Sequence, residues 1–229
     1  MRKLIIAILA VCAAGLLYLC YASIMGPIEF DQEKARREKA VIARLIDIRD
    51  AQLEYRKQHS QYTADFDSLI NFIKHGYVQS LYKVGELSDL QREDGLTEEK
   101  AVQIINKAKQ TNNWSEVEKL GLTEFKRDTI EVPVLENLFK GKKGFNADSI
   151  KIVPFSGGQS FILDAKVDTI QSGPARFFEA RTPYNVYLQG LDKQEIENMI
   201  YIRQQLDRYP GLKVGSMEEP ITTGNWESL

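Results

Sequence analysis

Apolar residues fill the start of the chain without interruption by charge. Residues 4–25 read LIIAILAVCAAGLLYLCYASIM and contain no Asp, Glu, Lys or Arg. A helix of this length is about 33 Å long, which matches a hydrocarbon core of roughly 30 Å. Tyr18 and Tyr21 lie near one end, where aromatic rings favour the membrane interface. The pattern predicts an N-terminal membrane anchor over residues 1–30, inserted through residues 4–25.

Two other interpretations of this segment stay open. Small residues before Ser23 are compatible with a cleaved signal peptide, although the apolar run exceeds the usual length of about 7–15 residues. A lipoprotein signal would use Cys12 or Cys20, but Val11 and Leu19 precede them where that processing favours a small residue. We therefore expect a retained transmembrane helix.

After the anchor the apolar positions follow a helical period. They recur along one long amphipathic helix over residues 31–59, at Val41, Leu45, Ile48 and Tyr55. Asp31 is expected to cap its start. A second amphipathic helix is predicted over residues 64–75 and ends at Gly76. Because the first helix lacks sustained heptads, we expect its apolar stripe to pack on its own domain.

Residues 83–127 are rich in charge and poor in apolar side chains. Thr97 can cap a helix over residues 98–109, and Ser115 with Glu118 forms a capping-box pattern for a shorter one. We expect this stretch to be a small helical insertion on the surface of the domain.

From Asp128 onward the period changes to two, which is typical of strands. The strands predicted from this pattern cover residues 128–134, 149–155, 160–170, 176–182 and 212–214. A helix is predicted over residues 193–207, with Asp192 at its cap. The sequence therefore predicts an α+β protein: a soluble domain over residues 31–229 with an antiparallel sheet of three to four strands and a C-terminal helix.

The charge balance argues against a nucleic-acid partner. The chain carries 30 Lys and Arg against 32 Asp and Glu, a formal net charge of −2, and the two signs are interleaved. Both cysteines, Cys12 and Cys20, lie within the apolar run. The soluble part therefore has neither a disulfide nor a thiolate metal site.

The sequence contains no pattern that identifies a reaction. His59 and His75 each lie near the predicted end of a helix, where a positive side chain is favoured by the helix dipole. No G-x-S-x-G, P-loop or G-x-G-x-x-G pattern carries a site. We therefore predict no catalytic residues, no metal site and no cofactor, and a role other than catalysis.

Four aromatic residues gather within a short stretch, at Phe177, Phe178, Tyr184 and Tyr187. They fit the core of a sheet domain, since aromatic residues favour strands. The alternative is an exposed aromatic surface for a protein partner. We keep these four residues as a possible partner surface.

Four segments of the chain are distinctive as sequence: PIEFDQEKARREKAVIARLIDIRDAQLEYRKQHSQYTADFDSLINFI from Pro27, then KRDTIEVPV, RYPGLKVGS and GNWE. Together they resemble a family of membrane-anchored proteins of Bacteroidetes for which no activity is established. They cover about two thirds of the chain. The resemblance implies an envelope location and supplies no catalytic residues.

The layout is also similar to that of type IV pilins and pseudopilins, in which an apolar N-terminal helix continues into an amphipathic one and a sheet follows. Those proteins carry a Gly before the cleavage point and a Glu early in the apolar helix. Here Leu16 follows Gly15 and no acidic residue enters the run. The likeness is therefore one of architecture.

The functional hypotheses follow from two expectations: a membrane anchor, and a soluble domain without a recognisable set of catalytic residues. We expect an interaction or structural subunit of a bacterial envelope assembly, with an envelope protein or a second copy as partner. The alternatives are a pilin-like filament subunit, and a small-ligand binder or enzyme. The basic N-tail of Arg2 and Lys3 favours an inner-membrane protein with a periplasmic domain, although Lys34, Arg36 and Arg37 follow the helix.

Overall fold

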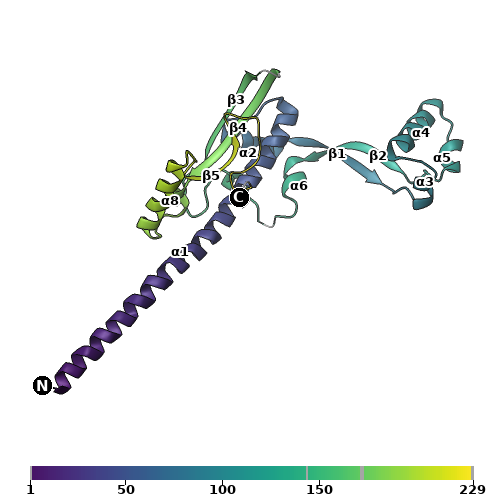
Figure 1. Ribbon diagram of the computed structural model, residues 1–229. Helices are drawn as coiled ribbons and strands as arrows, with labels where there is room; N and C mark the ends of the chain where they lie inside the picture. Colours follow the sequence, from purple (N-terminus) through teal and green to yellow (C-terminus); the bar gives the residue numbers. More distant parts are fainter. Residues whose placement is uncertain (1, 143, 171–172, 228–229) are drawn as a thin grey trace. The chain divides into compact units, whose positions relative to one another are not determined.

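The chain folds into two compact units that both combine helices with antiparallel strands. Figure 1 shows the computed structural model, which describes residues 2–142, 144–170 and 173–227. Unit 1 comprises Met1–Phe72 and Gly144–Leu229, and unit 2 comprises Ile73–Lys143. The mixture of helices and antiparallel strands confirms the predicted α+β class.

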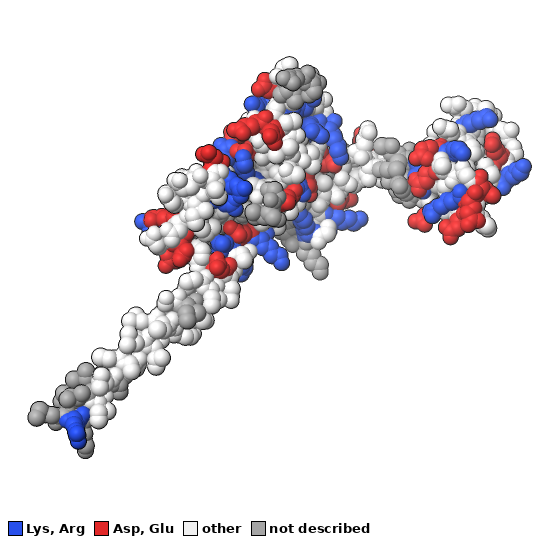
Figure 2. All heavy atoms as spheres, in the orientation of Figure 1, with Lys and Arg blue, Asp and Glu red and all other residues white. Residues whose placement is uncertain are grey.

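Helix α1 (Arg2–His59) joins the apolar segment to the folded part of unit 1 without a break. We expected Asp31 to cap a separate helix, but α1 continues through Gly26 and Pro27. Asp31 therefore lies inside the helix, where its carboxylate is 3.4 Å from the ammonium of Lys34. Among the described helices, α1 is the one long and apolar enough to cross a membrane. Figure 2 shows blue side chains at the N-terminal tip of α1 and white side chains along the stretch that follows.

The second half of α1 forms the centre of the unit 1 core. Its side chains Val41, Leu45 and Ile48 are fully buried, as the helical period predicted. Gln52 continues this face and is also fully buried. Its amide nitrogen donates to the Thr63 carbonyl at 2.6 Å and its amide oxygen accepts from the Thr63 backbone N–H at 3.1 Å. Because both ends of the amide are paired, the buried polar side chain holds the turn that leads to α2 (Phe66–His75).

A three-stranded antiparallel sheet belongs to the same unit. Its order is β3 (Ile162–Ile170), β4 (Gly173–Pro183) and β5 (Gly211–Ser216), so β4 is central. Leu163 pairs with Ala180, and Ala180 pairs with Val214. The strands predicted over residues 160–170 and 176–182 therefore both exist and lie in one antiparallel sheet. Helices α7 (Tyr184–Tyr187) and α8 (Lys193–Gln205) connect β4 to β5.

One predicted strand of this sheet is wrong. Residues 149–155 lie in the end of the short 3₁₀ helix η1 (Ala147–Ser149) and the turns that follow. Only Ile152 forms an isolated bridge, to Ser160. The buried residues Ile150 and Val153 are three positions apart, and this spacing suits turns better than a strand of period two.

Unit 2 is built on a two-stranded ribbon. Strand β1 (Tyr77–Val84) pairs antiparallel with β2 (Lys126–Pro133), from Tyr77 opposite Pro133 to Val84 opposite Lys126. The strand predicted from Asp128 therefore exists, but it pairs outside the three-stranded sheet. β1 escaped prediction because YVQSLYKV lacks a clean alternation of apolar and polar residues.

Helices lie at both ends of the ribbon within unit 2 (Figure 1). Helix α6 (Val134–Phe139) follows β2 directly. At the other end, α3 (Asp89–Glu93), α4 (Glu98–Thr111) and α5 (Ser115–Lys119) form a compact region, residues 84–127, that we call the head. The predicted helical insertion over residues 83–127 coincides with this head.

The register of β3 generates a stability prediction. Leu163 and Val167 lie on the same face of β3, but Leu163 is 8% exposed and Val167 is 54% exposed. Leu163→Asp places an uncompensated charge in the core and is expected to lower the free energy of unfolding by about 3 kcal/mol or more. Val167→Asp is expected to change it by about 0.5 kcal/mol or less.

Denaturant unfolding of the detergent-solubilised full chain, followed by circular dichroism, measures both variants. Equal effects of the two substitutions would contradict the observed burial of Leu163 and exposure of Val167.

Candidate functional site

The four aromatic residues retained as a possible partner surface are buried in the core. Phe177 and Phe178 are 2% and 0% exposed, and Tyr184 and Tyr187 are 3% and 0% exposed. A surface made of these side chains is therefore excluded, and their other interpretation, as core residues, is the correct one.

Both faces of the central strand are covered, which explains why two consecutive phenylalanines are buried. Successive side chains of a strand point to opposite faces. The ring of Tyr62 packs on Phe178 with centroids 4.7 Å apart, whereas the ammonium of Lys166 lies 4.9 Å from the ring centroid of Phe177. Neither face of β4 at this point is available to a partner.

Tyr187 connects α7 to α1 through a buried polar contact. Its hydroxyl donates to the carboxylate of Glu38 at 3.4 Å. Burial raises the pKa of Tyr187, and it also raises the pKa of Glu38, against the opposing influence of Lys34. Nearby, the Arg203 Nε donates to the hydroxyl of Tyr184 at 3.2 Å. These groups join α1, α7 and α8, and none of them lines a pocket described in the structure.

The two histidines lie at the C-terminal ends of helices α1 and α2. The His59 ring stacks on Tyr55 with centroids 4.0 Å apart, and its Nδ1 lies 3.1 Å from the Tyr55 carbonyl oxygen. His75 ends α2 and is exposed. Among the residues whose placement is described, no group of three or more His, Cys, Asp or Glu side chains could hold a metal ion.

The head, which we expected to be a surface insertion, has a small apolar core of its own. The buried residues of this core are Leu87, Ala101, Ala108, Val117, Leu122 and Phe125. Local signals position the helices around it: Thr97 caps α4 by accepting from the Lys100 backbone N–H, and Ser88 forms a capping box with Gln91. Asn112, in the left-handed conformation at φ 53°, ends α4.

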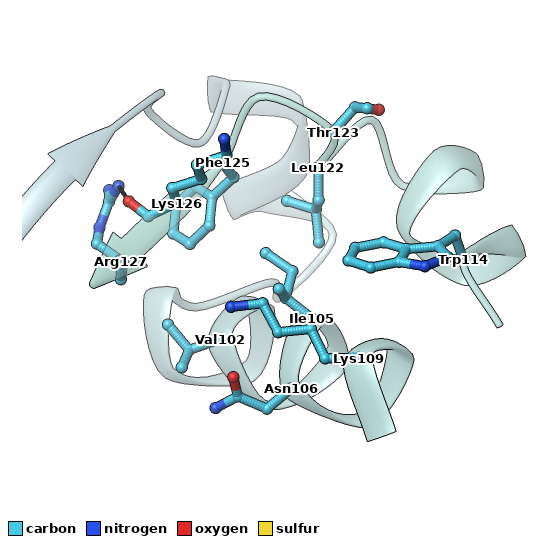
Figure 3. A pocket seen from close by; sticks show the side chains of 10 residues that line it. All are labelled: Val102, Ile105, Asn106, Lys109, Trp114, Leu122, Thr123, Phe125, Lys126 and Arg127. Atoms are coloured by element: carbon cyan, nitrogen blue, oxygen red, sulfur yellow. Dashed lines mark hydrogen bonds between the residues drawn. The ribbon is translucent and has the colours of Figure 1, made fainter. Parts of the chain in front are cut away.

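An apolar groove lies beside this core. It has a volume of about 100 Å³. Figure 3 shows its walls: α4 on one side, the segment that leads into β2 on the other, and the indole of Trp114 at one end. The residues that line it are Val102, Ile105, Asn106, Lys109, Trp114, Leu122, Thr123, Phe125, Lys126 and Arg127. Trp114 is 41% exposed, so the groove opens to solvent.

The helical repeat of α4 explains why these residues share one wall. Val102, Ile105 and Lys109 are spaced by three and four positions and so lie along one face of the helix. Ala101 and Ala108 form the neighbouring face, which is buried in the core of the head. Val102 and Ile105 pack against this core and are only partly buried, so the α4 groove face keeps some apolar surface open.

The rim of the groove carries only positive charge. Residues 84–127 hold nine Asp and Glu against seven Lys and Arg, yet three cations and no carboxylate line the groove. Figure 2 shows several acidic side chains elsewhere on the visible face of the head. Among the described residues, the exposed ammonium groups of Lys109 and Lys126 have no hydrogen-bond or ion-pair partner. The groove therefore combines an apolar floor with unpaired positive charge.

Arg127, the third cation that lines the groove, is buried and paired. Its side chain is 5% exposed, and its guanidinium pairs with the carboxylate of Glu98 at 3.1 Å. It also donates to the carbonyls of Val84 and Gly85, each at 3.0 Å, and lies 4.0 Å from the ring centroid of Phe125. Arg127 thereby joins the ribbon to α4 and holds the floor of the groove in place.

A more polar hollow of about 320 Å³ lies next to Arg127. It is lined by Gly85, Glu86, Arg92, Glu98 and Arg127. Its two carboxylates balance its two guanidinium groups, so it offers no net charge to a ligand. The apolar groove is consequently the stronger candidate for a binding site.

The sequence analysis did not predict this groove, although it recognised the apolar positions of one of its walls. The apolar positions of α4 were recognised, but the facing wall comes from residues 122–127 at the other end of the head. Nothing in the local pattern of either segment indicated that the two would meet.

No protein-family model, curated protein or solved structure matches this chain. The resemblance to membrane-anchored proteins of Bacteroidetes and the pilin-like layout are thus not tested by a relative. The candidate site rests on geometry and charge.

The burial of Glu38 generates a pH-dependent prediction. Because its pKa is higher in the folded chain than its ordinary value of 4.5, the folded chain binds this proton more tightly than the unfolded chain. The contribution of Glu38 to the free energy of unfolding is therefore fully present below pH 4.5, the ordinary pKa. It is lost as the pH rises through the pKa of Glu38 in the folded chain. Glu38→Gln removes the loss and keeps an acceptor for Tyr187. The melting temperature of this variant relative to the natural chain is expected to increase from about pH 4 to about pH 7.

Differential scanning fluorimetry at both pH values measures this difference, with Glu116→Gln at an exposed position as the control. A relative melting temperature that stays constant or decreases with pH would contradict the burial of an ionisable Glu38.

The contacts of Arg127 generate a second prediction. Arg127→Ala leaves the Val84 and Gly85 carbonyls without this donor and is expected to destabilise the head by roughly 2–3 kcal/mol. Arg92→Ala, which removes an exposed arginine 3.7 Å from Asp89, is expected to cost about 0.5 kcal/mol or less. Hydrogen exchange of the α4 amides measures the local opening of the head in both variants. Similar α4 protection in the two variants would argue against the central role of Arg127.

Proposed function

We propose that this chain is a membrane-anchored interaction subunit of an envelope assembly, and that the head binds its partner. The observation that carries the proposal is the continuity of α1. Its uncharged run over residues 4–25 and the second half, one face of which is buried in unit 1, belong to one helix. The anchor is therefore joined directly to the core of a folded unit.

The head supplies the second part of the argument. It has its own core and an apolar groove with a cationic rim. Exposed apolar surface bordered by polar residues is typical of protein-interaction sites. The groove encloses about 100 Å³, below the roughly 300–1,000 Å³ of sites for drug-sized ligands. Its size favours a protein partner over a small molecule.

The proposed location is the inner membrane, with both folded units in the periplasm. The support is the basic tail of Arg2 and Lys3, because a short basic tail ahead of the first helix favours the cytoplasmic side. Protease treatment of spheroplasts is expected to degrade the units and leave the anchor.

A pilin-like filament subunit is the second candidate. The continuous α1 favours it, because it has an exposed apolar half and a half that packs in a sheet domain. This candidate predicts proteolytic processing of the N-terminus. Detection of an intact Met1 on the mature protein by mass spectrometry would argue against it.

Cross-linking in live cells tests the leading proposal. A tagged full-length chain is cross-linked, recovered from detergent and analysed by mass spectrometry, and a recurrent envelope protein or a ladder of self-linked copies is expected. The matched control replaces residues 85–125 with Asn-Gly. This control keeps the ribbon, because Val84 faces Lys126 and Asn-Gly favours a two-residue hairpin turn.

Loss of the captured species in the control would support binding through the head. Recovery of the full-length chain as an uncross-linked monomer would overturn the proposal.

A further inference from the structure

The groove combines an apolar floor with positive charge at its rim. Its floor is formed by Ile105, Leu122 and Phe125, and Figure 3 shows the Lys109 side chain extending along this floor from α4. A volume of about 100 Å³ compares with roughly 150 Å³ for a cavity that holds benzene. The groove is therefore sized for one anchoring side chain and is too small for a long acyl chain. The unpaired ammonium groups of Lys109 and Lys126 favour carboxylates beside that anchor.

The chain itself carries a segment with this chemistry. Leu90 on α3 is 74% exposed, more than any other large apolar side chain recorded among the described residues. α3 buries none of its residues. Asp89 precedes Leu90, and Glu93 and Asp94 follow within one turn, so an exposed apolar side chain is bordered by carboxylates. Asp89 is almost fully exposed and its ion pair with Arg92, at 3.7 Å, is weak.

Leu90 does not fill the groove of its own head, because it is exposed and Gln91 holds α3 elsewhere. The Gln91 amide donates to the Leu120 carbonyl at 2.6 Å, and α3 contributes none of the groove lining. A contact between Leu90 and the groove therefore requires two copies of the chain.

We propose that the groove of one head receives Leu90 of a second copy, with Asp89 and Glu93 facing Lys109 and Lys126. This inference rests on the proposed interaction role and names the partner as the chain itself. The contact removes the exposed leucine from water and pairs two free cations with exposed carboxylates. Charge reversal on either surface brings like charges together and opposes the contact.

Two assemblies follow from this single contact. If each of two heads inserts its Leu90 into the groove of the other, the contact closes a dimer. If only one head inserts its Leu90, the pair retains a free groove and a free Leu90, and the assembly continues into a ring or filament. The number of copies in a cross-linked species distinguishes them.

Site-specific photo-cross-linking of the full-length chain in cells tests the inference. A benzoylphenylalanine at the exposed rim position Thr123 is expected to link two copies, and the linked peptide is expected to contain Leu90. Leu90→Asp, and separately Lys109→Glu with Lys126→Glu, are expected to lower the yield at least about tenfold. Because all three positions are exposed, the head is expected to fold in each variant.

Matched controls separate the contact from a general effect of charge. Lys107→Glu with Lys119→Glu reverses two exposed cations of the same head outside the groove, and Leu135→Asp changes an exposed leucine on α6. The cross-linking yield of each control variant is expected to stay within about twofold of the yield of the natural sequence.

A charge exchange between two differently tagged copies gives the strongest test. One copy carries Asp89→Lys with Glu93→Lys, and the other carries Lys109→Glu with Lys126→Glu. Co-expression is expected to restore the link that the second copy cannot form with itself.

Four results would overturn the inference: no link between copies, a linked peptide without Leu90, a yield unaffected by Leu90→Asp, or a link from Thr123 to another protein. The head-deletion experiment separates this failure from that of the proposed function. If an envelope partner is captured through the head but no link to Leu90 forms, the proposed interaction role stands and only this inference fails. If neither is found, both proposals fail.

Discussion

The burial of one face of α1 is the constraint on which unit 1 depends. Val41, Leu45 and Ile48 have no exposed surface, and full burial of each such side chain contributes roughly 1.5–3 kcal/mol. The strands and short helices of unit 1 come from residues after position 60, and they assemble a core that this face completes. Gln52, paired at both ends of its amide with Thr63, extends the same face without leaving a polar group unsatisfied.

The same helix gives the apolar residues of the chain two different environments. In the first half of α1, side chains such as Leu16 and Leu17 are exposed in a run that is long and apolar enough to cross a membrane. In the second half, other residues of unit 1 surround the apolar side chains. One continuous helix therefore joins the candidate membrane span to the core of unit 1.

The head follows a different principle. It is small, its surface is charged, and its core is limited to six buried residues. Arg127 compensates by joining Glu98, two backbone carbonyls and the Phe125 ring at one point. The adjacent face of α4 is only partly buried against this core. The same head carries Leu90 at its surface, 74% exposed, so this small region combines an open apolar groove with an exposed leucine.

The sequence by itself determined the features that depend on neighbouring residues. The apolar run, the helical stripe at Val41, Leu45 and Ile48, the caps at Thr97 and Asp192, and the strand character of β3 and β4 all follow from local composition and period. Tertiary structure alone decided which segments meet. It placed β2 against β1, converted residues 149–155 into turns, and buried Phe177 and Phe178 on opposite faces of one strand. It also brought α4 to residues 122–127 to form the groove. The reason is physical: period and capping act over a few residues, whereas burial depends on what the rest of the chain places against each face.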